Sequence, residues 1–127
     1  MKHPIGQHYE YTEDGKTKAI LTYRGMTFEG VAKTHPEDTF YPAVGADLAT
    51  CRAMVKLLKF TLNFEIRQQI KSLEHLMATF ETSTQYDPKN YEATRTRSYY
   101  WHLKEEETEC LSAIEGIKLY IDSFRTK

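Results

Sequence analysis

Two long runs of apolar residues at helical spacing, separated by Asp87-Pro88, constrain this chain most strongly. A helix does not easily pass through proline or through the residue before it, so the helical pattern must break there. The first run ends with the apolar stripe Leu62, Ile66, Ile70, Leu73, Met77 and Phe80. The second run carries the apolar stripe Leu103, Cys110, Ile114, Ile117, Ile121 and Phe124, which Glu107 interrupts. Because the stripes match in length, we predict an antiparallel helical hairpin of the coiled-coil type.

The segment before the helices has the pattern of a β-hairpin. Thr17 to Tyr23 and Met26 to Lys33 are rich in β-branched and aromatic residues that roughly alternate, with Arg24-Gly25 between them. The alternation separates Ala19, Leu21 and Tyr23 from Ile20 and Thr22, and Met26 and Phe28 from Glu29 and Val31. A lone hairpin is marginal in water, so we expect it to pack on a helix or to pair with another strand.

These patterns predict an α+β protein, with an N-terminal antiparallel β-hairpin or small sheet followed by a long α-helical hairpin. Residues 1–16 are polar and without sustained periodicity, which predicts a flexible N-terminal arm. The predicted single domain, residues 17–127, comprises a β-hairpin and crossing loop over 17–42, a helical segment over 43–84 and a second long helix over 88–126. Either one long bent helix or two helices that meet near residues 60–63 would satisfy the first helical pattern.

The apolar residues that lie off the main seams favour self-association. Phe64, Leu76, Leu111, Leu119 and Tyr120 are of this kind, and burial in an oligomer explains them most simply. We therefore expect a homo-oligomer, either a dimer or a larger assembly.

Charge and composition favour a small ligand or a protein partner. The net charge of −1 provides no overall basic field, so we expect no long nucleic acid as a partner. No apolar run approaches the roughly 20 residues of a membrane span, and the polar first residues do not resemble a signal peptide. The two cysteines, Cys51 and Cys110, lie in helix-like segments rather than in a disulfide framework. We expect a cytoplasmic protein that does not bind a membrane.

The densest functional chemistry surrounds the Asp87-Pro88 bend. The candidate ligand-binding residues are Phe80, Asn90, Tyr91, Arg95, Arg97, Tyr99 and Trp101. Aromatic faces stack on planar rings and arginine matches phosphate oxygens, so this composition suits a nucleotide-like anion. It equally suits a protein interface, where Tyr, Trp and Arg are enriched. A purely structural interpretation also stands, in which the aromatics close the end of the hairpin and the arginines pair with Glu81 or Glu92.

Other candidate sites are weaker. Arg24 and Gly25 form a possible second phosphate site, although a hairpin turn with a solvated arginine explains them as well. The loop that contains His35 and Asp38 is better explained by helix capping than by metal binding. The chain has no glycine-rich phosphate loop, paired CxxC, HExxH or nucleophile elbow. We therefore predict no enzyme, no catalytic residues, no metal site and no cofactor.

Residues 19–59 carry a family resemblance. The stretch YRGMTFEGVAKTHPEDTFYPAVGADLATCRAMVKLLK combines two strands, an HPxD-type loop and the pattern GxxLAxxRA. With the helical pair and the cluster at the bend, it resembles the anti-Thoeris sponge proteins of phages. The resemblance implies an N-terminal antiparallel sheet, two C-terminal helices and assembly into dimers or larger oligomers. It further implies sequestration, without cleavage, of the cyclic ADP-ribose type of signal made by a bacterial TIR-domain enzyme.

The resemblance also assigns roles to residues. A phenylalanine that stacks on adenine, a supporting asparagine and phosphate-binding arginines correspond to Phe80, Asn90, Arg95 and Arg97. Some family members bind cyclic oligonucleotides at a separate, oligomer-dependent site, for which Arg24 is the candidate. We thus expect a phage-encoded anti-defence protein in the host cytoplasm. One alternative is a protein-binding inhibitor of a defence enzyme, of the anti-CRISPR kind. The other is a double-stranded-RNA or ribosome-binding module, because the same patterns also resemble small bacterial proteins with double-stranded-RNA-binding-like or hibernation-factor-like folds.

Overall fold

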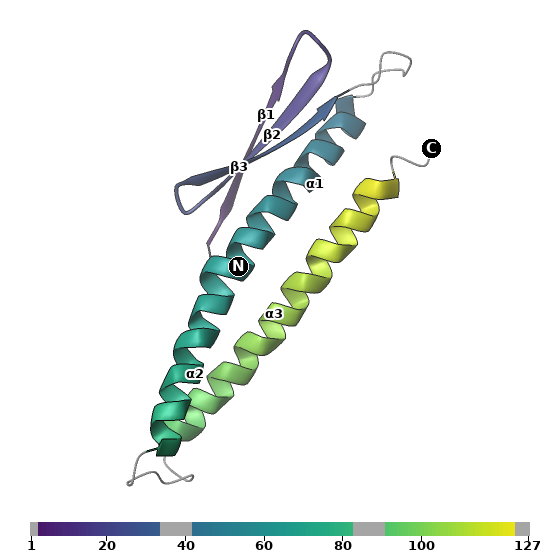
Figure 1. The fold of residues 1–127 in the computed structure, drawn as a ribbon. Helices are drawn as coiled ribbons and strands as arrows, with labels where there is room; N and C mark the ends of the chain where they lie inside the picture. The colour runs from purple at the N-terminus through teal and green to yellow at the C-terminus, as the bar shows by residue number, and fades with distance from the viewer. Residues whose placement is uncertain (1–2, 34–41, 83–90, 124–127) are drawn as a thin grey trace. The chain divides into compact units, whose positions relative to one another are not determined.

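The structure, a computed structural model, describes residues 3–33, 42–82 and 91–123 (Figure 1). The fold class is α+β, as predicted, with an N-terminal antiparallel sheet followed by helices. The elements are β1 (Ile5–Tyr11), β2 (Lys16–Tyr23), β3 (Met26–Lys33), α1 (Pro42–Phe60), the π-helical segment η1 (Thr61–Ile66), α2 (Arg67–Thr82) and α3 (Tyr91–Ser123). None of the helices, within these described ranges, is long and apolar enough to cross a membrane.

The described residues fall into two compact units. One unit contains the described parts of Met1–Lys59 and Ile114–Lys127, which are the sheet, α1 and the end of α3. The other contains Phe60–Ala113 without the undescribed residues 83–90, which are η1, α2 and the first part of α3. The predicted loop over 34–41, including His35 and Asp38, and the Asp87-Pro88 bend lie outside the described residues.

The sheet has three antiparallel strands in the order β1-β2-β3. The predicted arm over residues 1–16 is therefore wrong for Ile5–Tyr11, which pairs with β2 from Ile5 opposite Tyr23 to Tyr11 opposite Thr17. β1 escaped prediction because it is an edge strand of mostly exposed residues, and its order comes from pairing with β2 rather than from its own apolar periodicity. The predicted hairpin, β2 and β3, thus pairs with another strand, as we expected of a hairpin that is marginal on its own.

The predicted hairpin turn at Arg24-Gly25 is confirmed. Arg24 has φ of 51° and Gly25 has φ of 78°. Two successive residues with positive φ join antiparallel strands without splaying them, because this turn follows the natural twist of the strands. Glycine adopts such a backbone without strain, and a solvent-exposed arginine tolerates it at a modest cost.

The core of the first unit lies between the sheet and α1. The predicted inward face of β2 is confirmed, since Ala19, Leu21 and Tyr23 are each only 1% exposed. They pack with Ala32 of β3 and with three buried residues of α1, which are Ala49, Ala53 and Leu57. Two polar contacts join the sheet to this helix: the Tyr9 and Thr50 hydroxyls share a 2.8 Å hydrogen bond, and Arg52 donates to the Val31 carbonyl. The small residues allow the helix to approach the sheet closely.

The second unit is an antiparallel helix pair, as the apolar stripes predicted. Leu62, Ile66 and Ile70 are buried on one side of the seam, and Leu103 and Cys110 on the other. The antiparallel direction is visible in two contacts, because Arg67 pairs with Glu107 whereas the later Glu74 accepts a hydrogen bond from the earlier Tyr100.

Helical backbone continues without a break from Pro42 to Thr82. Of the two predicted alternatives, this favours one long helix over two separate helices that meet near residues 60–63. At residues 61–66 it changes to a π-helical segment, where the Arg67 amide donates to the Leu62 carbonyl five residues earlier. A π-helical turn shifts the phase of the side chains without ending the helix. The apolar stripe can therefore continue from α1 into α2.

Candidate ligand-binding site

Of the seven predicted ligand-binding residues, four have described side chains. Arg95, Arg97, Tyr99 and Trp101 lie in the first turns of α3. Asn90 lies outside the described residues, and so do the side chains of Phe80 and Tyr91. The predicted stacking role of Phe80 and supporting role of Asn90 therefore remain predictions.

The helix divides these four residues between two faces. Residues two apart on an α-helix point in nearly opposite directions, whereas residues four apart lie one above the other. Arg95 therefore shares a face with Tyr99, and Arg97 shares a different face with Trp101. The structure does not bring the two arginines together into one pocket.

The Arg95 face is tied to α2. The Tyr99 hydroxyl donates a 2.8 Å hydrogen bond to Oε1 of Gln69, and its side chain is 40% exposed. Arg95 is exposed one helical turn before it. This hydrogen bond gives Tyr99 a structural role in the α2–α3 pair.

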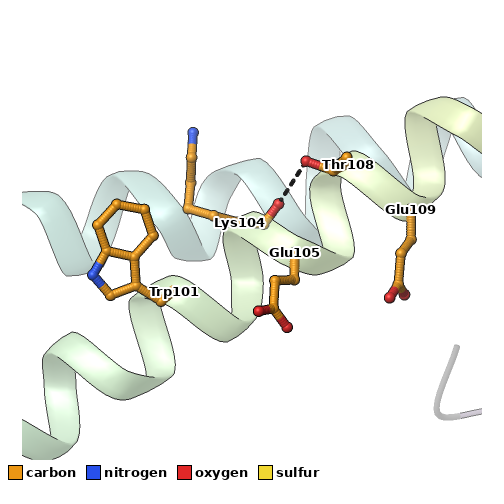
Figure 2. A pocket seen from close by; sticks show the side chains of 5 residues that line it. All are labelled: Trp101, Lys104, Glu105, Thr108 and Glu109. Carbon is orange, nitrogen blue, oxygen red and sulfur yellow. Dashed lines mark hydrogen bonds between the residues drawn. The ribbon is translucent and has the colours of Figure 1, made fainter.

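The Arg97 face carries an exposed aromatic ring. Trp101 is 63% exposed and meets the Tyr100 ring edge-on, with the centroids 5.3 Å apart. An open hollow at this point is lined by Trp101, Lys104, Glu105, Thr108 and Glu109 (Figure 2). Lys104 and Thr108 lie along one edge of this hollow and the two carboxylates along the other (Figure 2). The ring therefore stands between a cationic side and an acidic side.

Glu107 links this region to α2. Its Oε2 accepts a 3.1 Å hydrogen bond from Nε of Arg67, and its Oε1 accepts one of 3.1 Å from Nζ of Lys104. Arg67 also donates from Nη1 to Oδ1 of Asn63 at 3.0 Å. None of these four residues was among the predicted ligand-binding residues. The signal that could have revealed them is Glu107 itself, a carboxylate in an apolar stripe.

The contacts of Glu107 make it a pH-dependent contributor to stability. The hydrogen bond from Lys104, together with the neighbouring charge of Arg67, lowers the pKa of Glu107. Its folded pKa thus lies below the ordinary value of about 4.3 for glutamate. The contribution is present in full above that value and is lost as the pH falls through the folded pKa.

We therefore expect Glu107→Gln to lower the free energy of unfolding by about 1 kcal/mol at pH 7, the value of a partly exposed ion pair. At pH 3 the two proteins should differ by less, because the wild-type carboxyl is then becoming protonated. Urea denaturation at both pH values measures this difference. An equal difference at pH 7 and pH 3 would contradict the ionic role of Glu107.

The remaining candidates supply no reactive centre. Arg24 and Gly25 form the hairpin turn of the first unit, and their role as a second phosphate site stays a prediction. Burial raises the pKa of both cysteine thiols, Cys51 and Cys110, which disfavours the nucleophilic thiolate. Within the described part of the chain, no group of three His, Cys, Asp or Glu residues is placed to hold a metal ion.

Comparison with known proteins assigns no family. No known family model, curated protein or solved structure matches the chain. The site must therefore be interpreted from its own chemistry.

Proposed function

We propose that this protein binds a cyclic nucleotide on the Arg97–Trp101 face of α3 and sequesters it without cleaving it. The observation that carries the proposal is the 63% exposed Trp101 ring with Arg97 one helical turn away on the same face. An exposed indole offers a stacking surface to a nucleobase, and a guanidinium offers paired donors to a phosphate. Base and phosphate of one ligand can therefore be held together.

The proposed ligand is of the cyclic ADP-ribose type, with cyclic oligonucleotides as a related possibility. The resemblance of residues 19–59 to phage anti-Thoeris sponges supports this choice. On the same ground we propose a phage anti-defence protein that acts as an oligomer in the host cytoplasm. Sequestration requires affinity and abundance rather than turnover. A stacking ring with a guanidinium on the same helix face can supply affinity for a nucleotide, which suits that task.

The only tryptophan of the chain provides a direct test. A base that stacks on Trp101 should quench its fluorescence during titration with cyclic ADP-ribose isomers and cyclic di- and trinucleotides. In calorimetry, Trp101→Ala should weaken binding about tenfold or more, since a stacked base contributes roughly 1–3 kcal/mol.

The two arginines supply a matched control. Arg97→Ala should weaken binding of the quenching nucleotide about tenfold, whereas Arg95→Ala, which removes the same charge from another face of α3, should leave it nearly unchanged. Both variants should remain folded. Equal losses of affinity in the two variants would reject the assignment to one helix face. Mass spectrometry of the ligand released by heat then separates sequestration, which returns the intact nucleotide, from cleavage.

A protein partner is the second candidate, because apolar side chains are exposed on η1 and on α3 in the second unit. Phe64 is 63% exposed and Leu111 is 41% exposed. Such residues are typical of protein interfaces. An inhibitor of a defence enzyme would use this surface without any nucleotide. If no nucleotide on the panel quenches Trp101, direct binding to a TIR-domain enzyme becomes the hypothesis to measure.

A further inference from the structure

Glu107 lies in the α2–α3 seam at a position where the apolar stripe of α3 would otherwise have an apolar residue. It lies four residues after Leu103 and three before Cys110, both of which are buried, and its own side chain is only 18% exposed. Replacement of a buried ion pair by apolar residues is often neutral or stabilising. The ion pairs of Glu107 contribute only about 1 kcal/mol, so an apolar residue that fills the seam would serve the fold about as well.

The contacts of Glu107 bring together cations from two helices. Each carboxylate oxygen accepts from a different partner, Arg67 of α2 and Lys104 of α3, both at 3.1 Å. Asn63 orients the same guanidinium from its other side. Glu107 and these two cations together carry a net charge of +1, and the carboxylate of Glu74 on α2 also acts on Lys104. Lys104 and Arg67 are 37% and 42% exposed, so both remain accessible from solvent.

One of these two cations, Lys104, also lies beside the aromatic ring of the candidate site. Lys104 lines the same hollow as Trp101. A second cation of α3 lies on the same stripe, because the spacing i, i+4, i+7 joins Arg97, Trp101 and Lys104. Along the helix, the Trp101 ring therefore lies between Arg97 and Lys104. The carboxylates of Glu105 and Glu109 follow Trp101 at intervals of four residues and line the same hollow, on the edge away from Lys104 (Figure 2). An anionic group attached to a stacked base is therefore attracted toward the Lys104 side.

We propose that Arg67 and Lys104 bind the phosphate groups of the ligand whose base stacks on Trp101, and that Glu107 is a positioning residue that holds both cations for this purpose. The inference rests on the proposed function and adds a phosphate site to it. Lysine has three N–H donors and arginine five, so the bonds to Glu107 and Asn63 leave donors for phosphate oxygens. Side chains ordered before binding lose less entropy when the ligand arrives, which favours affinity.

Three probes test the phosphate site: cyclic ADP-ribose, adenosine, which has the base but no phosphate, and inorganic pyrophosphate. Arg67→Ala and Lys104→Ala should each weaken cyclic ADP-ribose and pyrophosphate binding about tenfold in calorimetry, the effect of one lost charge-assisted hydrogen bond. Quenching of Trp101 by adenosine should be unchanged. Lys118→Ala, which removes a charge from a lysine paired with Glu115 elsewhere on α3, is the control and should bind like the wild type.

The positioning role of Glu107 is tested by two variants of equal charge. Glu107→Gln keeps an acceptor for the cations, whereas Glu107→Leu keeps none but fills the seam. The Gln variant should bind pyrophosphate about fivefold or more tightly than the Leu variant, while adenosine binding stays the same in both. The melting temperature of the Leu variant should equal or exceed that of the Gln variant, which separates positioning from stability. Equal pyrophosphate affinities would overturn the role of Glu107.

Failure of this inference differs from failure of the proposed function. If the wild type binds cyclic ADP-ribose and the Arg67 and Lys104 variants bind it equally well, the phosphate site is rejected and the stacking site stands. If the wild type binds none of the three probes and no cyclic oligonucleotide, both are rejected.

Discussion

Gly30→Ala is expected to lower the free energy of unfolding by about 3 kcal/mol, measured by urea denaturation. Gly30 lies in β3 where α1 crosses the sheet. A Cβ at this position would lie 2.0 Å from the carbonyl oxygen of Ala49 and 2.4 Å from the amide nitrogen of Ala53. Both are backbone atoms of α1, so no side-chain rotation relieves the clash. The helix has to move away from the sheet, and the contacts of the first unit's core weaken.

Gly116→Ala provides the control for this prediction. Gly116 lies inside α3, and a Cβ there would meet nothing within 4 Å. Alanine favours a helix interior over glycine by about 0.5–1 kcal/mol, so this variant should be slightly more stable than the wild type. A Gly30→Ala variant with the unfolding midpoint of the wild type would contradict the close approach of α1 to β3.

Leu57→Ala is expected to cost about 3 kcal/mol of unfolding free energy, as is usual when a buried leucine is truncated and a cavity remains. Leu57 is completely buried and belongs to the cluster formed by α1 and the inner face of the sheet. The measurement is again urea denaturation, with the slope compared to confirm that the same surface unfolds.

The same substitution at an exposed position isolates the effect of burial. Leu119 of α3 is 70% exposed, so Leu119→Ala should change the free energy of unfolding by less than about 0.5 kcal/mol. Comparable losses for the two leucines would mean that Leu119 is covered, for example by a second copy of the chain, because removal of an exposed side chain leaves no cavity.

The candidate site was predictable in its residue types but not in its geometry. The cluster of arginine and aromatic residues after the bend is visible in the sequence, and it contains Trp101 and Arg97. Its division into two faces depends on α3 extending through Arg95 to Trp101 as regular helix. Had those residues formed part of the loop, both arginines could have reached one ligand.

For the phosphate site that we infer, the sequence showed one residue but not its partners. Glu107 was visible as an interruption of an apolar stripe, which is local information. Its partner Arg67 is 40 residues away in the sequence, and only the register of α2 against α3 determines which cation faces it. Lys104 was closer to prediction, because three residues on a helix suffice for contact.

By itself, the sequence determined those features that follow from neighbouring residues. Apolar spacing determined the long helices and their antiparallel pairing, alternation determined the inner face of β2, and Arg24-Gly25 determined the turn between β2 and β3. Only the tertiary structure revealed β1, the close contact at Gly30 and the linkage of Arg67 to Lys104 through Glu107. The spacing of apolar residues reflects the geometry of a single helix or strand, so it can be recognised in the sequence. An edge strand, a helix–sheet contact and an ion pair between helices each depend on a partner distant in sequence, which folding alone brings into place.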